Sequence, residues 1–255
     1  MSLLAARQLN ISLGGRSLCH DLSVAFDAGE NWAILGPNGS GKTTLLHTLA
    51  GLRPPDAGQV LLDGHDIGAL TRRHLAQRRG VLFQDSETPF ASGVRDAVLS
   101  GRHPHLSPWQ WEGPGDVQRA EQSLAEVDML HYADRLLTSL SSGERRRVEF
   151  AALLTQDAPV CLLDEPLNHL DLHHQVKILR LLRQRSLRTG HVNIMVLHDI
   201  NLALRYCDHG LLLFNDGACR HGALASLLDV PTLEQLYGCR FRQLGDTDDS
   251  VFFPA

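Results

Sequence analysis

The stretch GENWAILGPNGSGKTTLLHTLAG, residues 29–51, contains an apolar run, a glycine-rich turn and a helix-forming segment in that order. The apolar run ends at Leu35 and predicts a buried strand, while the segment after the turn predicts a helix closed by Gly51. Between them, GPNGSGKT at residues 36–43 matches the G-x-x-x-x-G-K-[ST] loop in the strand-to-helix context that this motif requires. The stretch therefore predicts an α/β core with a phosphate-binding loop rather than an ordinary glycine turn.

This loop supplies the first group of candidate binding residues. Glycines allow successive backbone amides to surround phosphate oxygens, and the following helix directs its positive end at the same anion. Lys42 would add a mobile positive charge, and Thr43 would offer its hydroxyl to magnesium. The sequence thus predicts a nucleoside triphosphate site that also holds Mg²⁺. The candidate triphosphate-binding residues in this segment are Gly36, Pro37, Asn38, Gly39, Ser40, Gly41, Lys42, Thr43 and Thr44.

A pair of carboxylates follows a second apolar run, PVCLLDEP, at residues 159–166. Asp164 would hold magnesium directly or through water, and Glu165 would polarise the water that attacks the γ-phosphate. Taken alone, such a pair is as typical of a helix-capping turn as of a catalytic site. Together with the phosphate loop it predicts hydrolysis.

The remaining patterns place these motifs in a larger fold. VNIMVLHD, residues 192–199, is another apolar run of strand length, and strands apolar on both faces indicate a buried parallel sheet. GQVLLDGHDI, residues 58–67, predicts a hairpin with Asp63 and Gly64 at its turn. Residues 86–140 are rich in proline, glycine and tryptophan before a helical pattern, which indicates an inserted, mostly helical lobe.

Composition excludes several classes of protein. Hydrophobic residues make up 43% and charged residues 21% of the 255-residue chain, as in globular domains. Since no apolar run approaches about 20 residues and the amino terminus lacks a secretion signal, we expect a cytosolic protein. A formal charge of −5 argues against a general nucleic-acid-binding surface. The 5 cysteines form no C-x-x-C pair and are interpreted as reduced packing residues.

LTSLSSGERRRVEF, residues 137–150, predicts the start of a helix. Ser141 and Glu144 form the S-x-x-E capping box, in which each side chain satisfies an unpaired backbone donor. Capping this helix could be the only role of the two serines and the glycine ahead of the three arginines. Whether they also have a functional role depends on motifs elsewhere in the chain.

The order of these motifs resembles that of the ATP-binding cassette (ABC) ATPases, over nearly the whole chain. After the phosphate loop come Gln84 in VLFQD, the LSSGE segment from residue 140, Asp164 and Glu165, NHLD ending at Asp171, and His198 in VLHDIN. The resemblance implies a single nucleotide-binding domain over residues 1–255. It would consist of a P-loop NTPase core with a mostly parallel sheet, an N-terminal antiparallel β subdomain, a helical subdomain inserted at about 87–146 and a short extension from about 231.

The resemblance implies that the triphosphate is ATP, and it also implies roles for residues outside the phosphate loop. In this family two cassettes pair head to tail, so Ser141, Ser142 and Gly143 would cap the triphosphate held by the other copy. Asp171 would reach across the same interface. Gln84 would contact magnesium and the attacking water, and His198 would hold the γ-phosphate. Glu165, His198 and Gln84 are then the catalytic candidates, and Thr43, Gln84 and Asp164 the magnesium ligands.

Three positions depart from the family pattern. Ser142 replaces a glycine, Glu144 replaces a glutamine, and Leu13 stands where many relatives place an aromatic ring against adenine. Leucine can pack on the base but cannot stack with it, which leaves open what contacts adenine.

The segments GRHPH, DEPLNHLDLHHQ and LHDINLALRYCDH, which begin at residues 101, 164 and 197, resemble one branch, the ATPases of bacterial metal-chelate importers. These take up siderophore iron, haem or cobalamin. The resemblance implies a homodimer beneath a membrane-spanning permease dimer, peripheral on the inner face of the cell membrane, with an external binding protein delivering the chelate. Trp109 and Trp111 would line the groove for a permease helix, or lie in the lobe's core.

Two alternatives remain open. A soluble ABC ATPase could instead act on nucleic acid or a protein assembly, although such relatives usually carry two fused cassettes or a long coiled coil. The histidines offer metal-ligand spacing, but the family pattern already accounts for NHLDLHH as an interface loop entering a helix. That helix is expected to bury Leu172, Val176, Leu179 and Leu182. The histidines concerned are His103, His105, His169, His173 and His174.

Overall fold

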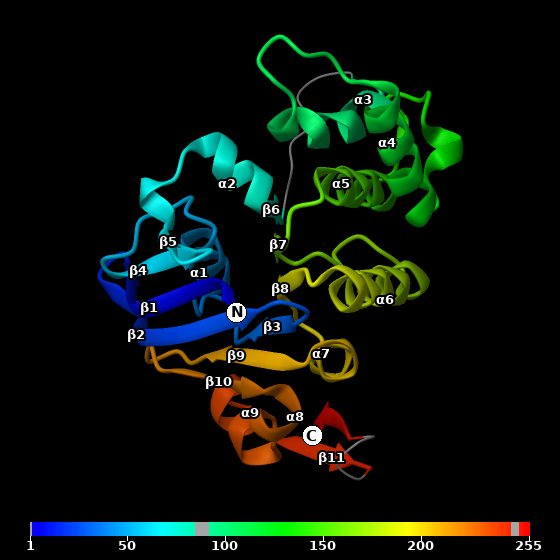
Figure 1. The fold of residues 1–255 in the computed structure, drawn as a ribbon. Coiled ribbons are helices and arrows are strands. Elements are labelled where there is room, and N and C mark those ends of the chain that lie inside the picture. Colours follow the sequence, from blue (N-terminus) through cyan, green and yellow to red (C-terminus); the bar gives the residue numbers. More distant parts are fainter. Residues whose placement is uncertain (1, 85–91, 246–249) are drawn as a thin grey trace.

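The computed structural model describes residues 2–84, 92–245 and 250–255. Its centre is a parallel sheet that lies between an antiparallel sheet on one side and a group of helices on the other (Figure 1). Among the described residues, every helix is too short or too polar to span a bilayer.

The central sheet has the strand order β10-β9-β3-β8-β7-β6. All neighbouring pairs are parallel except β9 and β10, so the predicted mostly parallel sheet is confirmed. Along β3, Trp32 and Ile34 face one core while Ala33 and Leu35 face the other. The strands are apolar on both faces because both faces are covered. Their bounds are β3 Asn31–Leu35, β6 Arg79–Leu82, β7 Val160–Leu163, β8 Val192–Val196, β9 His209–Leu213 and β10 Cys219–Ala223.

The antiparallel sheet has the order β2-β1-β4-β5. Asp63 and Gly64 join β4 to β5 with φ values of 51° and 80°, so the predicted hairpin is confirmed with two left-handed residues at its turn. The bounds are β1 Ser2–Leu13, β2 Arg16–Asp27, β4 Ala57–Leu62 and β5 His65–Asp66. This sheet and helix α1, Lys42–Leu49, cover one face of the central sheet.

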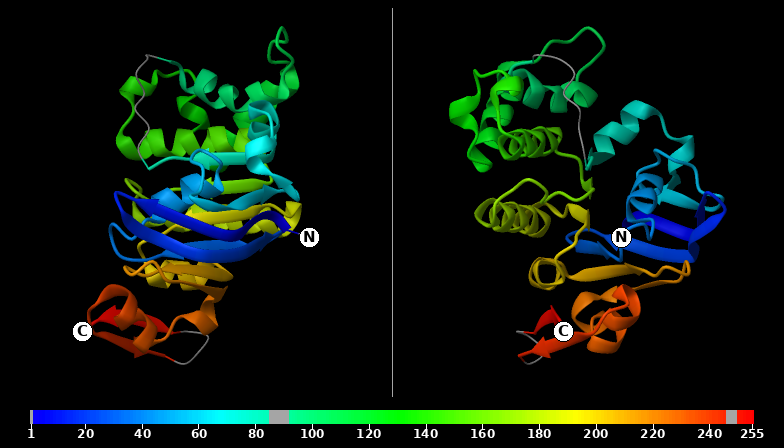
Figure 2. Two further views of the ribbon diagram at one scale, coloured as in Figure 1. Left: turned by 90° about the vertical axis from the view of Figure 1, so that its left-hand side faces the viewer. Right: turned by 180° about the vertical axis from the view of Figure 1, so that it is seen from behind.

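Helices cover the opposite face and form a lobe at one end of the molecule, far from the carboxyl terminus (Figure 2). The lobe contains α3 Val94–Leu99, η2 Ser100–His105, α4 Pro114–Glu126, η3 Leu130–Tyr132, η4 Leu137–Ser139 and α5 Ser142–Gln156. Its expected start near residue 87 lies outside the described residues. The other elements are η1 Ile67–Ala69, α2 Arg72–Arg78, α6 Leu172–Thr189, α7 Ile200–Tyr206, α8 Leu224–Leu227, α9 Val230–Tyr237, β11 Phe241–Leu244 and β12 Val251–Pro254.

Some expectations about burial were wrong. Leu179 and Leu182 of α6 are buried, but Leu172 in its first turn is 68% exposed and lines an open surface hollow instead of the core. Trp109 and Trp111 are 96% and 86% exposed, which rules out a core role for them. The cysteines are all free thiols, and Cys239 is exposed instead of packed.

Candidate functional site

The phosphate loop follows β3 and ends at Gly41, which caps the start of α1. Gly41 has φ 98°, a left-handed conformation that glycine adopts without steric cost. A Cβ atom there would lie 2.9 Å from the Leu18 side chain, so glycine is also needed for the close contact with β2. Since no side chain caps α1, its first backbone N–H groups are available to an anion.

A pocket of about 450 Å³ opens at this loop. Segments far apart in the sequence contribute to its wall, among them the ends of β6, β7 and β8. The lining residues are Leu13, Leu18, Asn38, Gly39, Gly41, Lys42, Thr43, Thr44, Gln84, Glu165 and His198. Most of the predicted binding and catalytic residues therefore meet in one place. Leu13 is 57% exposed at its rim.

Lys42 is folded back onto its own loop. Its Nζ donates hydrogen bonds to the carbonyl oxygens of Gly36 at 2.8 Å and Pro37 at 2.9 Å, and only 6% of the residue is exposed. Burial lowers the pKa of Lys42, and the nearby charges of Glu165 and Asp164 oppose that shift. The ammonium group is thus held at the phosphate loop in a largely dry position, where its charge is weakly screened.

Asp164 lies beneath the pocket and is 1% exposed. Its Oδ1 accepts a hydrogen bond of 3.1 Å from the Thr43 hydroxyl, whereas Oδ2 has no hydrogen-bond partner among the described residues. His47 Nε2 lies 3.9 Å from that oxygen. Burial raises the pKa of Asp164, and the bond from Thr43 opposes this shift. An orphaned carboxylate oxygen beside a hydroxyl is the kind of donor set that Mg²⁺ accepts, so the residues fit the ion.

Glu165 adopts a left-handed backbone with φ 45°, which is unusual for a residue with a side chain. His198 Nε2 lies 2.8 Å from its Oε1, and the Asn168 side-chain amide donates a hydrogen bond of 2.6 Å to its Oε2. Burial acts to raise the pKa of Glu165, but the hydrogen bonds from His198 and Asn168 and the charge of Lys42 outweigh it, so the pKa is lowered. The carboxylate is therefore held ionised and oriented.

The segment from Ser141 to Gly143 begins α5, and the predicted capping box is confirmed. The Ser141 backbone N–H donates to Glu144 Oε2 at 2.8 Å, and the Glu144 N–H donates to Ser141 Oγ at 3.3 Å. A Cβ atom on Gly143 would lie 2.7 Å from the carbonyl oxygen of His169, so this glycine lets α5 approach the NHLD segment.

Asp171, which ends the NHLD segment, caps α6. Its Oδ1 accepts a hydrogen bond of 2.9 Å from the His174 backbone N–H. Among the described residues, those lining the nucleotide pocket include neither Asp171 nor Ser141, Ser142 or Gly143. Within a single chain, the candidate ATP-binding residues therefore form two separate groups, one in the pocket and one at the starts of α5 and α6.

Two of the histidines with metal-ligand spacing have other partners. His105 Nε2 lies 2.8 Å from the carbonyl oxygen of Gln156, and His103 Nε2 lies 3.2 Å from Glu112. In the described ranges, no group of three or more histidine, cysteine, aspartate or glutamate side chains is arranged to hold a metal ion.

Comparison with known proteins identifies the family. A family model described as ABC transporter matches residues 19–168. The chain belongs to the ABC transporter family. It is an ATP-binding ATPase subunit of that family, with the ABC ATPase fold.

Individual relatives are similar to this chain over most of its length. The ferric enterobactin transport ATP-binding protein FepC of Escherichia coli (strain K12) is 35% identical, over 95% of this chain and 90% of its own. A solved metal-chelate type ABC transporter in an inward-facing conformation matches with a TM-score of 0.85 and 26% identity, over 100% of this chain and 98% of the other. A dimeric bacterial ABC transporter cassette matches with a TM-score of 0.76 and 25% identity, over 87% and 98%.

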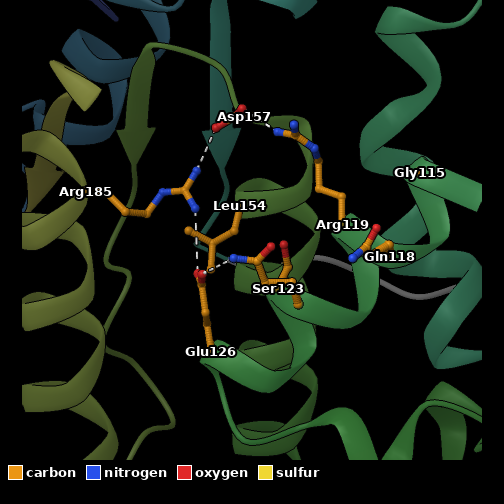
Figure 3. A pocket seen from close by; sticks show the side chains of 9 residues that line it. Gly115, Gln118, Arg119, Ser123, Glu126, Leu154, Asp157 and Arg185 are labelled. Atoms are coloured by element: carbon orange, nitrogen blue, oxygen red, sulfur yellow. Dashed lines mark hydrogen bonds and ion pairs between the residues drawn. The ribbon is translucent and has the colours of Figure 1, made fainter. Parts of the chain in front are cut away.

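A second hollow, of about 430 Å³, lies between the helical lobe and α6 of the cassette (Figure 3). Asp157, at the carboxyl end of α5, pairs with Arg119 of α4 and with Arg185 of α6, the latter at 2.8 Å. Arg185 also lies 3.6 Å from Glu126. These ion pairs connect the lobe to the core and include none of the residues at the nucleotide pocket.

Sequence reasoning missed Arg146, a residue that is 3% exposed and whose side chain reaches the backbone of the Asp164–Glu165 turn. Because arginine side chains are usually exposed to solvent, the residue type gave no reason to expect Arg146 in the interior. A signal was present, because helical spacing places Arg146 on the same face as Phe150 and Leu153, both buried. Asn168 was also missed as a partner of Glu165, although it lies within the NHLD motif.

Proposed function

We propose that this chain is the ATP-hydrolysing subunit of an importer for a metal chelate, such as siderophore iron, haem or cobalamin. The observation that carries the proposal is the separation of its two ATP-contacting groups. Lys42, Glu165 and His198 share one pocket, while Ser141 and Asp171 lie outside it. A complete site therefore requires a second copy, which is how the ATPases of this family couple nucleotide to movement.

The chemistry follows from the pocket residues. The phosphate loop and the uncapped start of α1 would bind the triphosphate, with Lys42 supplying charge. Thr43, Asp164 and Gln84 would hold Mg²⁺, which neutralises negative charge on the phosphates when bound. Glu165 would accept the proton of the attacking water, and His198 would hold the γ-phosphate while fixing the Glu165 carboxylate at 2.8 Å.

The second copy would complete the site across a two-fold interface. The amino-terminal end of α5, with Ser141, Ser142 and Gly143, would direct its backbone N–H groups at the γ-phosphate held by the other copy. Asp171 would approach the same interface from the start of α6. The dimeric cassette with a TM-score of 0.76 supports this arrangement. ATP binding would close the dimer, and hydrolysis would reopen it.

The cargo and the partners follow from relatives. A ferric enterobactin transport protein and a metal-chelate type transporter both match nearly the whole chain. We therefore assign the dimer to the inner face of the cell membrane beneath a permease dimer, with an external binding protein delivering the chelate. The exposed Trp109 and Trp111 would contact the permease.

The test is reconstitution with a candidate permease from the same organism. Vesicles containing both should accumulate a ferric siderophore, haem or cobalamin only with MgATP and the binding protein. Accumulation should stop when Glu165→Gln replaces the wild type. Stable co-purification with nucleic acid or ribosomes, and no permease, would instead support the soluble alternative.

A further inference from the structure

Arg146 makes an unusual set of contacts for a charged side chain. Its guanidinium lies in the interior of the cassette, 3% exposed. Nε donates to the Pro166 carbonyl at 3.2 Å. Nη2 donates to the carbonyls of Asp164 at 3.1 Å and Glu165 at 2.9 Å. Three successive carbonyl oxygens are thus bound by one planar group.

The remaining N–H groups point elsewhere. Nη1 donates to the Phe83 carbonyl at 2.6 Å and to Glu149 Oε2 at 2.9 Å. An arginine has five N–H donors in a fixed fork, and here five acceptors surround it. No other side chain has this number and geometry of donors, since lysine has three around one nitrogen and glutamine has two.

Four of these acceptors are backbone carbonyls of the two segments that carry the catalytic candidates, and the fifth, Glu149 Oε2, belongs to α5 itself. Phe83 directly precedes Gln84. Asp164 and Glu165 are themselves the magnesium and water carboxylates of the proposed mechanism. The contacts at residues 164–166 surround the point where Glu165 takes its left-handed backbone, φ 45°. Binding three carbonyls to one cation offsets the steric cost of that conformation.

Arg146 itself lies in the second turn of α5, whose first residues carry the partner-facing segment. The Arg146 side chain is long, but burial and its five hydrogen bonds hold it in one conformation, so it moves with the helix. Any tilt of α5 therefore shifts the carbonyl groups beneath it, and with them the Glu165 carboxylate and the start of the Gln84 segment.

We propose that Arg146 is a positioning residue that couples the amino-terminal end of α5, where the second copy's nucleotide is bound, to the orientation of Glu165 and Gln84. This inference rests on the proposed function, because it assumes the cross-subunit site. Arg146 acts on the chemical step and not on nucleotide binding, since its four carbonyl acceptors belong to the segments of Gln84 and Glu165, its fifth acceptor is Glu149 of α5, and none of the five belongs to the phosphate loop.

The experiment compares two arginines on one helix. Arg147 donates to the carbonyls of Val127 and Asp128 in the helical lobe, and these are not acceptors of Arg146. Each is replaced by Gln in turn, and kcat, KM and the Kd for MgATP are measured on the transporter complex. We expect Arg146→Gln to lower kcat by on the order of tenfold to a hundredfold with Kd unchanged. Arg147→Gln, the matched control, should keep the wild-type kcat.

Arg146→Lys keeps the charge and most of the volume, and it decides the question if Arg146→Gln does not fold. It should resemble the Gln variant in kcat, because one nitrogen cannot reach all the acceptors. A wild-type kcat in Arg146→Lys, or a parallel loss of kcat and MgATP affinity, would overturn the positioning role. Absence of ATP hydrolysis in the wild-type complex would instead refute the proposed function.

Discussion

In the proposed function, Glu165 is the residue on which the chemistry of this cassette depends most. Both oxygens of its carboxylate are held, by His198 and Asn168, in an orientation that the left-handed backbone directs into the pocket. A glutamine in its place retains the size and one acceptor oxygen but cannot accept a proton.

Replacing Glu165 with Gln should therefore leave MgATP binding intact and reduce turnover by roughly a hundredfold to ten-thousandfold. An ATP-bound dimer should accumulate, detectable by size-exclusion chromatography with MgATP. Glu112→Gln, at a carboxylate that pairs with His103 outside the pocket, is the control and should hydrolyse ATP normally. Unchanged steady-state hydrolysis in Glu165→Gln would refute its role.

The motif residues could be predicted because each combines a residue type with a fixed spacing in a recognisable local context. Lys42, Glu165 and His198 are examples, and they lie together in the pocket. Arg146 could not be predicted in the same way. Its position depends on acceptors at residues 83 and 164–166, which only the folded chain brings around it. Sequence patterns report local preference, whereas burial of a charge depends on tertiary contacts.

Helix α5 begins with a capping box that contains a charged residue, Glu144. The backbone and hydroxyl of Ser141 lower the pKa of Glu144 to about 2, with help from Tyr132. Because this pKa lies below that of the unfolded chain, the stabilisation is present above the unfolded value and is lost as pH falls toward the folded one.

Glu144→Gln keeps the shape of the capping box without a titrating group. The difference in unfolding free energy between wild type and variant should be greatest at neutral pH and should shrink toward about pH 3. Urea unfolding at both pH values measures it. A difference independent of pH would show that the charge of Glu144 does not stabilise the cap.

The junction between the lobe and α6 is the second element to test. Asp157 ends α5 with φ 55° and pairs with Arg119 and Arg185. Asn tolerates that backbone and has a similar volume, so Asp157→Asn removes mainly the charge. We expect a loss of roughly 1 kcal/mol in unfolding free energy, since the carboxylate is partly exposed. Asp134→Asn, at a carboxylate that is 90% exposed, should cause no measurable change.

The strands could be predicted more completely than the helices. Apolar runs such as residues 192–196 predict strands that are covered on both sides, and these residues are all buried in the central sheet, between the two cores on its faces. The apolar face of α6 was predicted correctly at Leu179 and Leu182 and wrongly at Leu172. Helical periodicity identifies a face but not where the neighbouring element stops covering it.

For the whole molecule, the decisive property is that Ser141 and Asp171 lie outside the pocket that holds Lys42, so that in the proposed function a second copy completes the site. Ser141→Arg places a long charged side chain at the proposed contact between copies. MgATP should still bind the phosphate loop of the variant, because Ser141 does not line that pocket, whereas dimer closure and turnover should be lost. Equilibrium binding and ATP hydrolysis measure the two effects separately.

Ser141→Ala is the matched control for Ser141→Arg. It removes the cap, at a cost of about 1 kcal/mol, without adding bulk, and should retain more turnover than the arginine variant. Full-rate hydrolysis by Ser141→Arg would contradict the account of a site shared between two copies.

The distribution of indole rings gives the cassette a built-in optical reporter. Of the 3 tryptophans, Trp32 is buried against His209 with ring centroids 4.7 Å apart, while Trp109 and Trp111 are almost fully in water. Red-shifted emission from the free chain therefore comes from a single loop of the helical lobe. Any protein or lipid that covers that loop will shift the emission to the blue, and the signal can be followed without attaching a dye.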